Sequence, residues 1–283
     1  MAVTATISAN PKVDRLSDEK FPIRNRSLHL SLELREKEVV ACLLDKHLNK
    51  YIAWATFSIN GKEKSTSDAL KEDFFASTIA DTSVVFTPNS SILVPALYFK
   101  KELVNDYLGF QQLDKLNETP CFDYIKNLDS YNLYTVNNES LSIMREVFPN
   151  ASFRHHSSIF IEYLLIENKS MHEDKVYITV FNKYMDVAVL QSGKLVLSNR
   201  FYYENDSDFM YYLLWVYEQL NLDTEKVPCV FYGEINPEKF AAAGKYIQKT
   251  KLGARNEQSG YVGSLDKLTV YKYRSLFTQY LCV

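Results

Sequence analysis

Few side chains in this sequence have the type and spacing of a catalytic or metal site. His155 and His156 are adjacent, and Glu162 follows in the same segment. Imidazole and carboxylate groups bind zinc and act as general acids and bases. Adjacent residues of an extended chain point in opposite directions, however, and no further ligand stands at a standard spacing. We therefore expect these residues to be structural polar groups at a domain boundary.

Carboxylates are the second group that could do chemistry. A two-metal nuclease of the ribonuclease H type needs several of them around its metals, and Glu33 is suitably placed near the end of an apolar strand. Asp45 falls at the far end of the next strand and Asp81 precedes a later one, so neither completes the cluster. The formal charge of −3 also lacks the basic excess of proteins that neutralise phosphates. We expect no nucleic-acid partner.

The cysteines predict no metal or redox site, since they are far apart and form no CxxC pair. They are expected to be free thiols: Cys42, Cys121, Cys229 and Cys282. The amino-terminal segment has charged residues where a signal peptide needs an apolar core. The longest apolar runs, such as YYLLWVY, are too short to cross a bilayer. We expect a cytoplasmic protein without a membrane span.

Composition and missing motifs further limit the class of protein and the kinds of site it could contain. With 283 residues, 46% of them hydrophobic and 24% charged, the chain fits a soluble globular protein of one large or two ordinary domains. The patterns GxxxxGK[ST], GxGxxG, GxSxG and HExxH do not occur. Their absence argues against the commoner phosphate-loop, dinucleotide, hydrolase and zinc-protease sites.

The first half of the chain predicts an order of three strands, a helix and a strand. Alternating leucines from Leu28 to Leu34 are typical of a half-buried strand. A helix is indicated where Leu70 and Phe74 stand four apart after polar cap residues. The expected ranges are strands 27–34, 37–45 and 49–59, the helix 67–80 and the strand 83–88.

The second half repeats this order. Asn205 to Ser207 supply cap candidates for its first helix, and Asn236 followed by Pro237 predicts the start of another. The expected strands are 175–182, 184–191, 194–203 and 228–235. An offset of 146 residues places Leu43-Leu44 on Val189-Leu190 and Val85 on Phe231 without a net gap. A shared order at constant offset is typical of a duplicated domain.

Further segments lie between and after these two copies. Hairpin-like stretches FDYIKNL and YNLYTV lie between the two copies, and the last part of the chain contains the longest expected loop. The expected ranges are helix 138–148, strand 151–154, a crossing helix 157–167, loop 250–266 and strand 268–273. We therefore predict a loose segment at 1–23, a first lobe at 24–155, and the crossing helix with a second lobe at 156–283.

Two such copies joined by a crossing helix resemble the actin-like ATPase fold, an α/β fold of two duplicated ribonuclease H-like domains with mixed sheets flanked by helices. More narrowly, the chain looks like an uncharacterised bacterial family with this fold. That family is similar to the cytoplasmic actin-like components of type IV pilus assembly and type II secretion. The stretch VAVLQSGKLVLSNRF (187–201) is the most suggestive local match.

The resemblance also implies where nucleotide chemistry would lie. In active members each lobe opens with a strand ending in Asp-x-Gly, whose carboxylate positions Mg²⁺ and whose glycine lets the backbone approach phosphates. Here the first lobe has Glu33 and Arg35, and the second has Thr179 and Phe181. The Gly-Gly turn that holds adenosine is reduced to Gly233. If a nucleotide still bound, the resemblance would assign it to Glu33, Arg35, Thr179, Asn182 and Gly233.

These replacements predict a non-catalytic actin-like protein, a pseudo-ATPase without a required cofactor, that serves as a protein-interaction or assembly module. The resemblance implies a partner such as a short peptide or the tail of a membrane protein, and homodimerisation is an additional option. The alternative is a divergent ATP-binding or kinase-like member that uses ATP and Mg²⁺. In it, Glu33 helps to hold the metal, Arg35 contacts a phosphate and Gly233 lies near the base.

Overall fold

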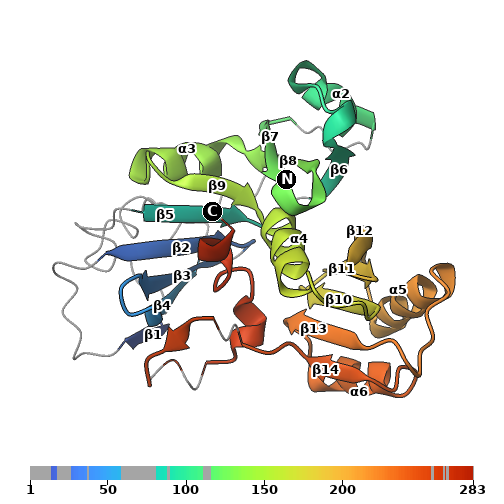
Figure 1. Ribbon diagram of the computed structural model, residues 1–283. Coiled ribbons are helices and arrows are strands. Elements are labelled where there is room, and N and C mark those ends of the chain that lie inside the picture. Colours follow the sequence, from blue (N-terminus) through green and yellow to red (C-terminus); the bar gives the residue numbers. More distant parts are fainter. Residues whose placement is uncertain are drawn as a thin grey trace. The chain divides into compact units, whose positions relative to one another are not determined.

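The computed structural model describes residues 14–17, 27–36, 38–58, 81–87, 90–110, 116–255, 258–263, 265 and 268–282 (Figure 1). These residues form two compact units. Unit 1 takes the described residues of Met1–Phe160, Asn256–Leu268 and Ser275–Val283, and unit 2 those of Ile161–Arg255 and Thr269–Arg274. The chain passes from unit 1 to unit 2 within helix α4 (His156–Glu167).

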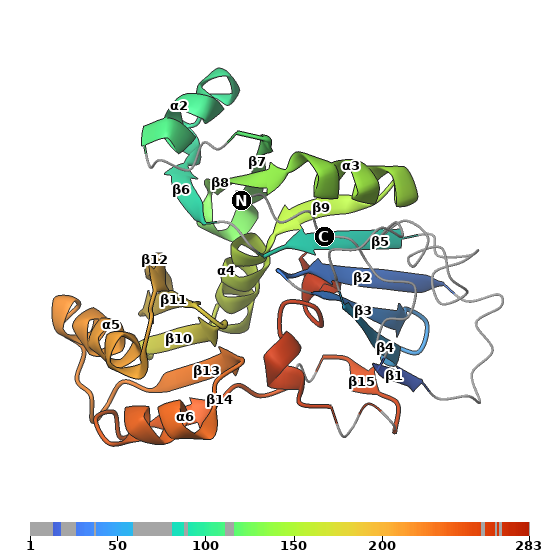
Figure 2. The same ribbon diagram turned by 180° about the vertical axis from the view of Figure 1, so that it is seen from behind.

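Unit 1 contains a seven-stranded mixed sheet. In spatial order its strands are β1 (Asp14–Ser17), β4 (Lys50–Ser58), β3 (Glu38–Asp45), β2 (Leu28–Leu34), β5 (Asp81–Phe86) and β9 (Ser152–His155), and β15 (Gly260–Tyr261) also pairs with β4 (Figure 2). Strands β2, β3 and β4 form an antiparallel meander, whereas β5 runs parallel to β2 and β9 parallel to β5. Strand β1 lies within the 1–23 segment that we expected to be loose.

Strand β2 is buried along its whole length, although its alternating pattern predicted only one buried face. The reason is the end of the chain, which lies on the polar side of the strand. Gln279 donates a hydrogen bond to the carbonyl of Leu32 at 3.0 Å, and Ser275 donates one to the carboxylate of Glu33. The polar residues of β2 are therefore covered by partners that lie far away in the sequence.

A three-stranded antiparallel sheet is inserted between β5 and β9. Its strands, in order, are β6 (Ser91–Pro95), β8 (Ser130–Asn137) and β7 (Glu118–Ile125), with short 3₁₀ turns η1 (Ala96–Tyr98), η2 (Lys101–Leu103) and η3 (Lys126–Leu128). Helix α2 (Val104–Phe110) packs Val104 and Leu108 against Val94 and Leu133 of this sheet. Helix α3 (Asn138–Val147) follows β8, and the Asn137 side chain caps it by accepting from Ser140 N.

Unit 2 contains a five-stranded sheet with two helices on one face. The strand order is β12 (Lys194–Tyr202), β11 (Tyr184–Gln191), β10 (Lys175–Val180), β13 (Cys229–Gly233) and β14 (Thr250–Leu252). Alternate residues of β10 join a core with α5 (Asp206–Gln219) and α6 (Pro237–Gly244). Asn205 and Asn236 cap these two helices, as the sequence predicted. Strands β13 and β14 run parallel to β10.

The two units repeat one arrangement of strands, as expected from the 146-residue offset. Strand β3 (38–45) maps under this offset onto the full length of β11 (184–191). Each copy also has a register irregularity at the same place, between Leu43 and Leu44 in one and between Val189 and Leu190 in the other. A β-bulge is a specific local feature of a strand pair, so its recurrence supports the predicted duplication.

Most other predicted elements are present. The helices expected at 138–148 and 157–167 and the strand expected at 151–154 correspond to α3, α4 and β9. The helix expected at 67–80 lies outside the described residues. The strand expected at 268–273 is wrong, because Val270–Tyr273 forms the 3₁₀ turn η5 beside β13. Both edges of β13 are already paired, with β10 and β14, so no further strand can join there.

The last described residues form another 3₁₀ turn, η6 (Gln279–Leu281), which contacts β2 and β5 in unit 1. None of the helices in the described ranges is both long and apolar enough to span a membrane.

Candidate functional site

The first candidate position lies at the end of β2. The side chain of Glu33 is fully buried, and its two carboxylate oxygens have different partners. Arg35 Nε donates to Glu33 Oε1 at 2.7 Å, and the Ser275 hydroxyl donates to Oε2. Arg35 also donates from Nη1 to Glu38 Oε1 at 3.3 Å. The two residues that the sequence assigned to metal and phosphate therefore bind each other.

The electrostatics of this pair favour the ionised carboxylate. Burial alone would raise the pKa of Glu33, but the charges of Arg35 and His156 and the hydrogen bonds from Ser275 and Arg35 lower it below its usual value. Arg35 thus supplies, from within the chain, positive charge of the kind that a bound Mg²⁺ would bring. A Mg²⁺ shell on Glu33 would require these hydrogen bonds to break first.

The carboxylates considered for a nuclease site do not meet. In the sheet register Glu33 lies opposite Val85, whereas Asp81 lies opposite His29, four positions earlier on β2. That offset corresponds to roughly 13 Å along a strand. Asp45 instead accepts hydrogen bonds from the backbone of the following turn, and Asp81 pairs with Lys46. The structure separates Glu33 from both acids, as the sequence predicted.

The second candidate position lies at the end of β10 in unit 2. Thr179 is buried, and its hydroxyl has no hydrogen-bond partner within the described residues. The ring of Phe181 stacks on Tyr184 with 4.6 Å between centroids, and the Tyr203 hydroxyl donates to the Phe181 carbonyl. Arg200 lies 3.9 Å from the centre of the Tyr184 ring. Aromatic packing therefore surrounds the point where the resemblance places a phosphate-binding turn.

Asn182 and Gly233 complete the set of sequence-predicted positions. Asn182 is exposed in the turn between β10 and β11. Gly233 has a φ of +78°, and a β-carbon on it would lie 2.2 Å from the carbonyl oxygen of Val180. Only glycine fits where the backbones of β13 and β10 approach so closely. This close approach is a structural reason for Gly233 that does not depend on a nucleotide.

His155 of the His155-His156 pair lies in a hydrogen-bond network that includes Asp123, Ser158 and Tyr134. Across the described part of the chain, no three His, Cys, Asp or Glu side chains are placed to hold one ion. His155 N and the Ser158 hydroxyl donate to one carboxylate oxygen of Asp123, at 2.7 and 2.6 Å, and the Tyr134 hydroxyl donates to the other at 2.9 Å. This network joins the inserted sheet to β9 and α4.

The same network brings a serine, a histidine and an aspartate together without the geometry of a catalytic triad. The Ser158 hydroxyl points to the carboxylate rather than to an imidazole nitrogen, and neither it nor His155 is more than 1% exposed. Burial raises the pKa of Asp123 despite its hydrogen bonds. Neither Asp123 nor Ser158 could be recognised from the sequence, because they stand 35 residues apart.

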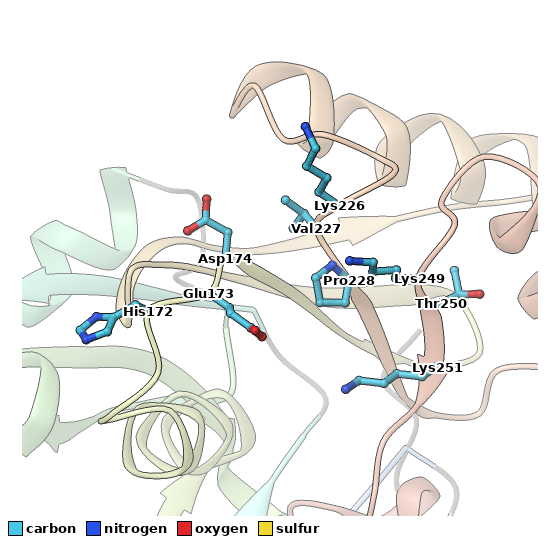
Figure 3. A pocket seen from close by; sticks show the side chains of 9 residues that line it. All are labelled: His172, Glu173, Asp174, Lys226, Val227, Pro228, Lys249, Thr250 and Lys251. Atoms are coloured by element: carbon cyan, nitrogen blue, oxygen red, sulfur yellow. The ribbon is translucent and has the colours of Figure 1, made fainter.

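A pocket of about 760 Å³ opens in unit 2, at the amino-terminal ends of β10, β13 and β14 (Figure 3). It includes three lysines, one histidine and two acids, with Val227 and Pro228 as the apolar part. Its lining residues are His172, Glu173, Asp174, Lys226, Val227, Pro228, Lys249, Thr250 and Lys251. Sequence reasoning missed this pocket, because its lysines come from two segments that form no recognisable motif.

Comparison with protein families identifies a family for this chain. A family model described as a protein of unknown function (DUF3822) matches residues 18–250. The search of curated proteins gives no match.

Solved structures give the fold. A crystal structure from Bacteroides thetaiotaomicron VPI-5482, of a protein with an actin-like ATPase fold and unknown function, is 18% identical, covers 83% of this chain and 95% of that chain, and has a TM-score of 0.74. The PilM-PilN type IV pilus biogenesis complex is 9% identical, covers 89% and 98%, and has a TM-score of 0.56. The chain therefore has the actin-like ATPase fold that its sequence predicted. At these identities the likeness extends to the fold alone.

Proposed function

We propose that this chain, which belongs to the DUF3822 family of proteins of unknown function, is a non-catalytic actin-like protein that acts as a protein-interaction or assembly module. One observation carries the proposal: both oxygens of the buried Glu33 carboxylate accept hydrogen bonds from within the chain, from Arg35 and Ser275. Metal-assisted phosphoryl transfer needs carboxylate oxygens and cations that are available to the ligand. Neither group is available here, so no nucleotide cofactor is required.

The inserted sheet supplies the surface for a protein partner in this proposal. Phe99 stacks on Tyr131 with 3.7 Å between ring centroids, and Phe122 and Tyr124 lie 6.0 and 5.0 Å from the same ring. Phe122 and Tyr124 are 37% and 45% exposed, and Leu97 nearby in the chain is 84% exposed. We call the rings of Phe99, Phe122, Tyr124 and Tyr131 the aromatic cluster. Clustered exposed aromatic side chains are typical of protein-binding surfaces.

The proposed partner is a protein segment with apolar side chains, such as the tail of a membrane protein, and the proposed compartment is the cytoplasm. Structural similarity to a protein solved as the PilM-PilN type IV pilus biogenesis complex suggests a partner for this chain as well. A second copy of the chain is an additional candidate for the same surface. The exposed rings favour an apolar partner over a nucleic acid, in line with the net charge of −3.

Thermal melting with nucleotide tests the proposal that the chain is non-catalytic and needs no nucleotide. Purified protein is melted with millimolar ATP or ADP and Mg²⁺, and with Mg²⁺ alone. A ligand that binds only the folded state at 100 times its Kd stabilises it by about 2.7 kcal/mol, which raises Tm by a few degrees. We expect no rise in Tm that depends on Glu33.

A nucleotide-dependent rise in Tm that disappears in Glu33→Gln would overturn the proposal. It would establish the divergent ATP-binding member instead, with Glu33 at the metal, Arg35 at a phosphate and Gly233 near the base. The conservative substitution preserves the volume of the side chain, and its own Tm without ligand serves as the reference.

Partner capture tests the proposed role as a protein-interaction module. Proteins bound by the tagged full-length chain in its native cells are compared with those bound by Phe122→Ser and Tyr124→Ser variants. A specific partner should be retained by the wild type and lost from both variants. A variant of the exposed Tyr246, which lies in unit 2, is the matched control and should retain it. Equal capture by all variants would exclude the aromatic cluster as the binding surface.

A further inference from the structure

The pocket of unit 2 has two lysines that form no ion pair within the part of the chain that the structure describes. Lys249 and Lys251 are exposed and, in the described residues, neither one pairs with a carboxylate. Figure 3 shows both side chains extending to one side of β14 while Thr250 points to the other. That opposite side is occupied, since the Thr250 hydroxyl would lie 3.3 Å from a β-carbon on Gly244. The strand therefore directs both ammonium groups to the pocket side.

The acids of the pocket have other partners. The Asp174 carboxylate accepts hydrogen bonds from Ser192 N at 3.0 Å and from Gln191 Nε2 at 3.4 Å. Glu173 lies 3.7 Å from the ammonium of Lys175. In the described residues, neither carboxylate forms an ion pair with Lys249 or Lys251.

The third lysine of the pocket, Lys226, is paired as well, at 2.8 Å from Asp223. The excess positive charge of the pocket therefore comes from Lys249 and Lys251. Two like charges that extend to the same side repel each other, and an anion between them removes this repulsion.

We propose that this pocket binds a compact anion with two adjacent phosphate groups, of the diphosphate class. Lys249 directly precedes β14 and Lys251 lies within it. Residues two apart are separated by at most roughly 6.6 Å, so the two flexible ammonium groups can each reach a different phosphate. Lysine is a common phosphate ligand that acts as a point charge, whereas a planar carboxylate is matched best by arginine, and none lines the pocket. Val227 and Pro228 provide the apolar wall, and the volume suits a small molecule.

This site is separate from the position that the fold family uses for nucleotides. Ligands of open α/β sheets usually bind at the carboxyl ends of the strands, where Thr179 and Phe181 lie in unit 2. The lysine pocket is at the opposite, amino-terminal ends of the same strands. It can therefore bind a diphosphate whether or not the proposed function is correct.

Isothermal titration of the full-length chain with inorganic pyrophosphate tests the proposal. Saturable binding is expected for the wild type, and a Lys249→Ala/Lys251→Ala variant should bind at least about tenfold more weakly, since it loses two charge-assisted contacts. Lys245→Ala is the matched control, because Lys245 is exposed on the same segment but does not line the pocket, and its affinity should not change. Affinity should also fall as the salt concentration rises.

Two further titrations define the ligand class. Orthophosphate, with one group, should bind more weakly than pyrophosphate, and malonate, with two carboxylates, should do the same. Malonate binding as tightly as pyrophosphate would overturn the diphosphate class. A lack of saturable pyrophosphate binding would overturn the site, and so would equal binding by the double variant. The two lysines would then be charges that protect an edge strand from pairing.

The same variants separate this site from the test of the proposed function. A rise in Tm with ADP that survives Glu33→Gln but disappears in Lys249→Ala/Lys251→Ala belongs to the lysine pocket. A rise with the opposite pattern belongs to the fold family's nucleotide position and would overturn the proposed function while leaving the pocket to be judged by pyrophosphate.

Discussion

At the scale of single residues, the buried pair of Glu33 and Arg35 gives the chain an internal substitute for a bound cation. Two charges removed from water cost several kcal/mol each, and their attraction offsets this cost only when the geometry is good and the remaining lone pairs are satisfied. Both conditions hold, with a 2.7 Å contact to Arg35 and a hydroxyl from Ser275 on the second oxygen. The pair should therefore stabilise the fold only as a unit.

We expect Arg35→Met to reduce the free energy of unfolding by about 3 kcal/mol, because it leaves the Glu33 charge buried without its cation. The double variant Glu33→Gln/Arg35→Met removes both charges and should recover at least half of the loss. Urea unfolding at neutral pH measures both values. A double variant as unstable as the single one would show that the charge pair is not the source of the effect.

The pH dependence of stability should depend on His29. This side chain is 2% exposed, and its Nε2 lies 2.9 Å from Ser83 Oγ. Ser83 donates its proton to Gln279 at 2.6 Å, so it must accept one from the imidazole. Burial lowers the pKa of His29 to about 4, since the effect of the nearby Asp81 charge is smaller. The folded chain thus favours the neutral ring.

Lowering the pH should destabilise the fold, because the unfolded chain takes up a proton on His29 before the folded chain does. Between pH 6.5 and about 4 the unfolded chain protonates this histidine and the folded chain does not, so stability is complete above pH 6.5 and falls as the pH is lowered. The expected loss is roughly 3 kcal/mol. His29→Gln keeps a donor for Ser83 but cannot titrate, so its urea midpoint should fall less over this range. Parallel pH profiles of the two proteins would contradict the assignment.

Sequence reasoning found individual residues of the site but not their partners. It identified Glu33 and Arg35 as replacements of a phosphate-binding pattern, because they follow a recognisable strand. It could not identify Ser275, which lies 242 residues away in the chain. The Asp123 network was missed for the same reason, as its members are spaced without any period. Contacts of this kind depend on how distant segments pack, and a single sequence gives no signal of that packing.

At the scale of elements, strands were predicted well because burial imposes a regular pattern on them. The order of strands, the hairpin turns and the asparagine caps all follow local rules. The exception at Val270–Tyr273 shows the limit of such rules, since its apolar residues are typical of a strand but the sheet has no free edge beside β13. Gly233 also shows the limit of local rules. Its resemblance to a nucleotide-binding signature suggested one role, whereas its close approach to the backbone of Val180 gives it a packing role.

Gly233→Ala should destabilise the protein by about 2 kcal/mol, because its φ is positive and the new β-carbon would meet the backbone of Val180. Gly263→Ala is the matched control, as a β-carbon there has no neighbour within 4 Å. Its effect should stay below about 0.5 kcal/mol. Urea unfolding compares the two. A Gly233 variant of normal stability that has lost an ATP-dependent rise in Tm would instead assign this glycine to a nucleotide site.

At the scale of the whole molecule, the end of the chain is part of the core of unit 1. Phe277 is fully buried, its carbonyl accepts a hydrogen bond from the Tyr51 hydroxyl at 2.5 Å, and Gln279 bonds to the backbone of β2. The sequence predicted two consecutive lobes, whereas the described residues of Ser275–Val283 group with unit 1 by their contacts. Unit 1 therefore needs Phe277 and Gln279 to complete its core.

A chain that ends at Arg274 should lose the folded structure of unit 1. The deletion exposes the polar side of β2, including the Glu33 carboxylate, and removes the Phe277 side chain, whose loss alone costs about 3–5 kcal/mol. Hydrogen exchange should then show protection lost in β2 and β3 and retained in β10 and β11. Phe277→Leu is the milder control, which should keep protection in both units at a lower stability. Retained protection of β2 in the truncated chain would contradict this role, because it would mean that the sheet of unit 1 closes without the segment that covers Glu33.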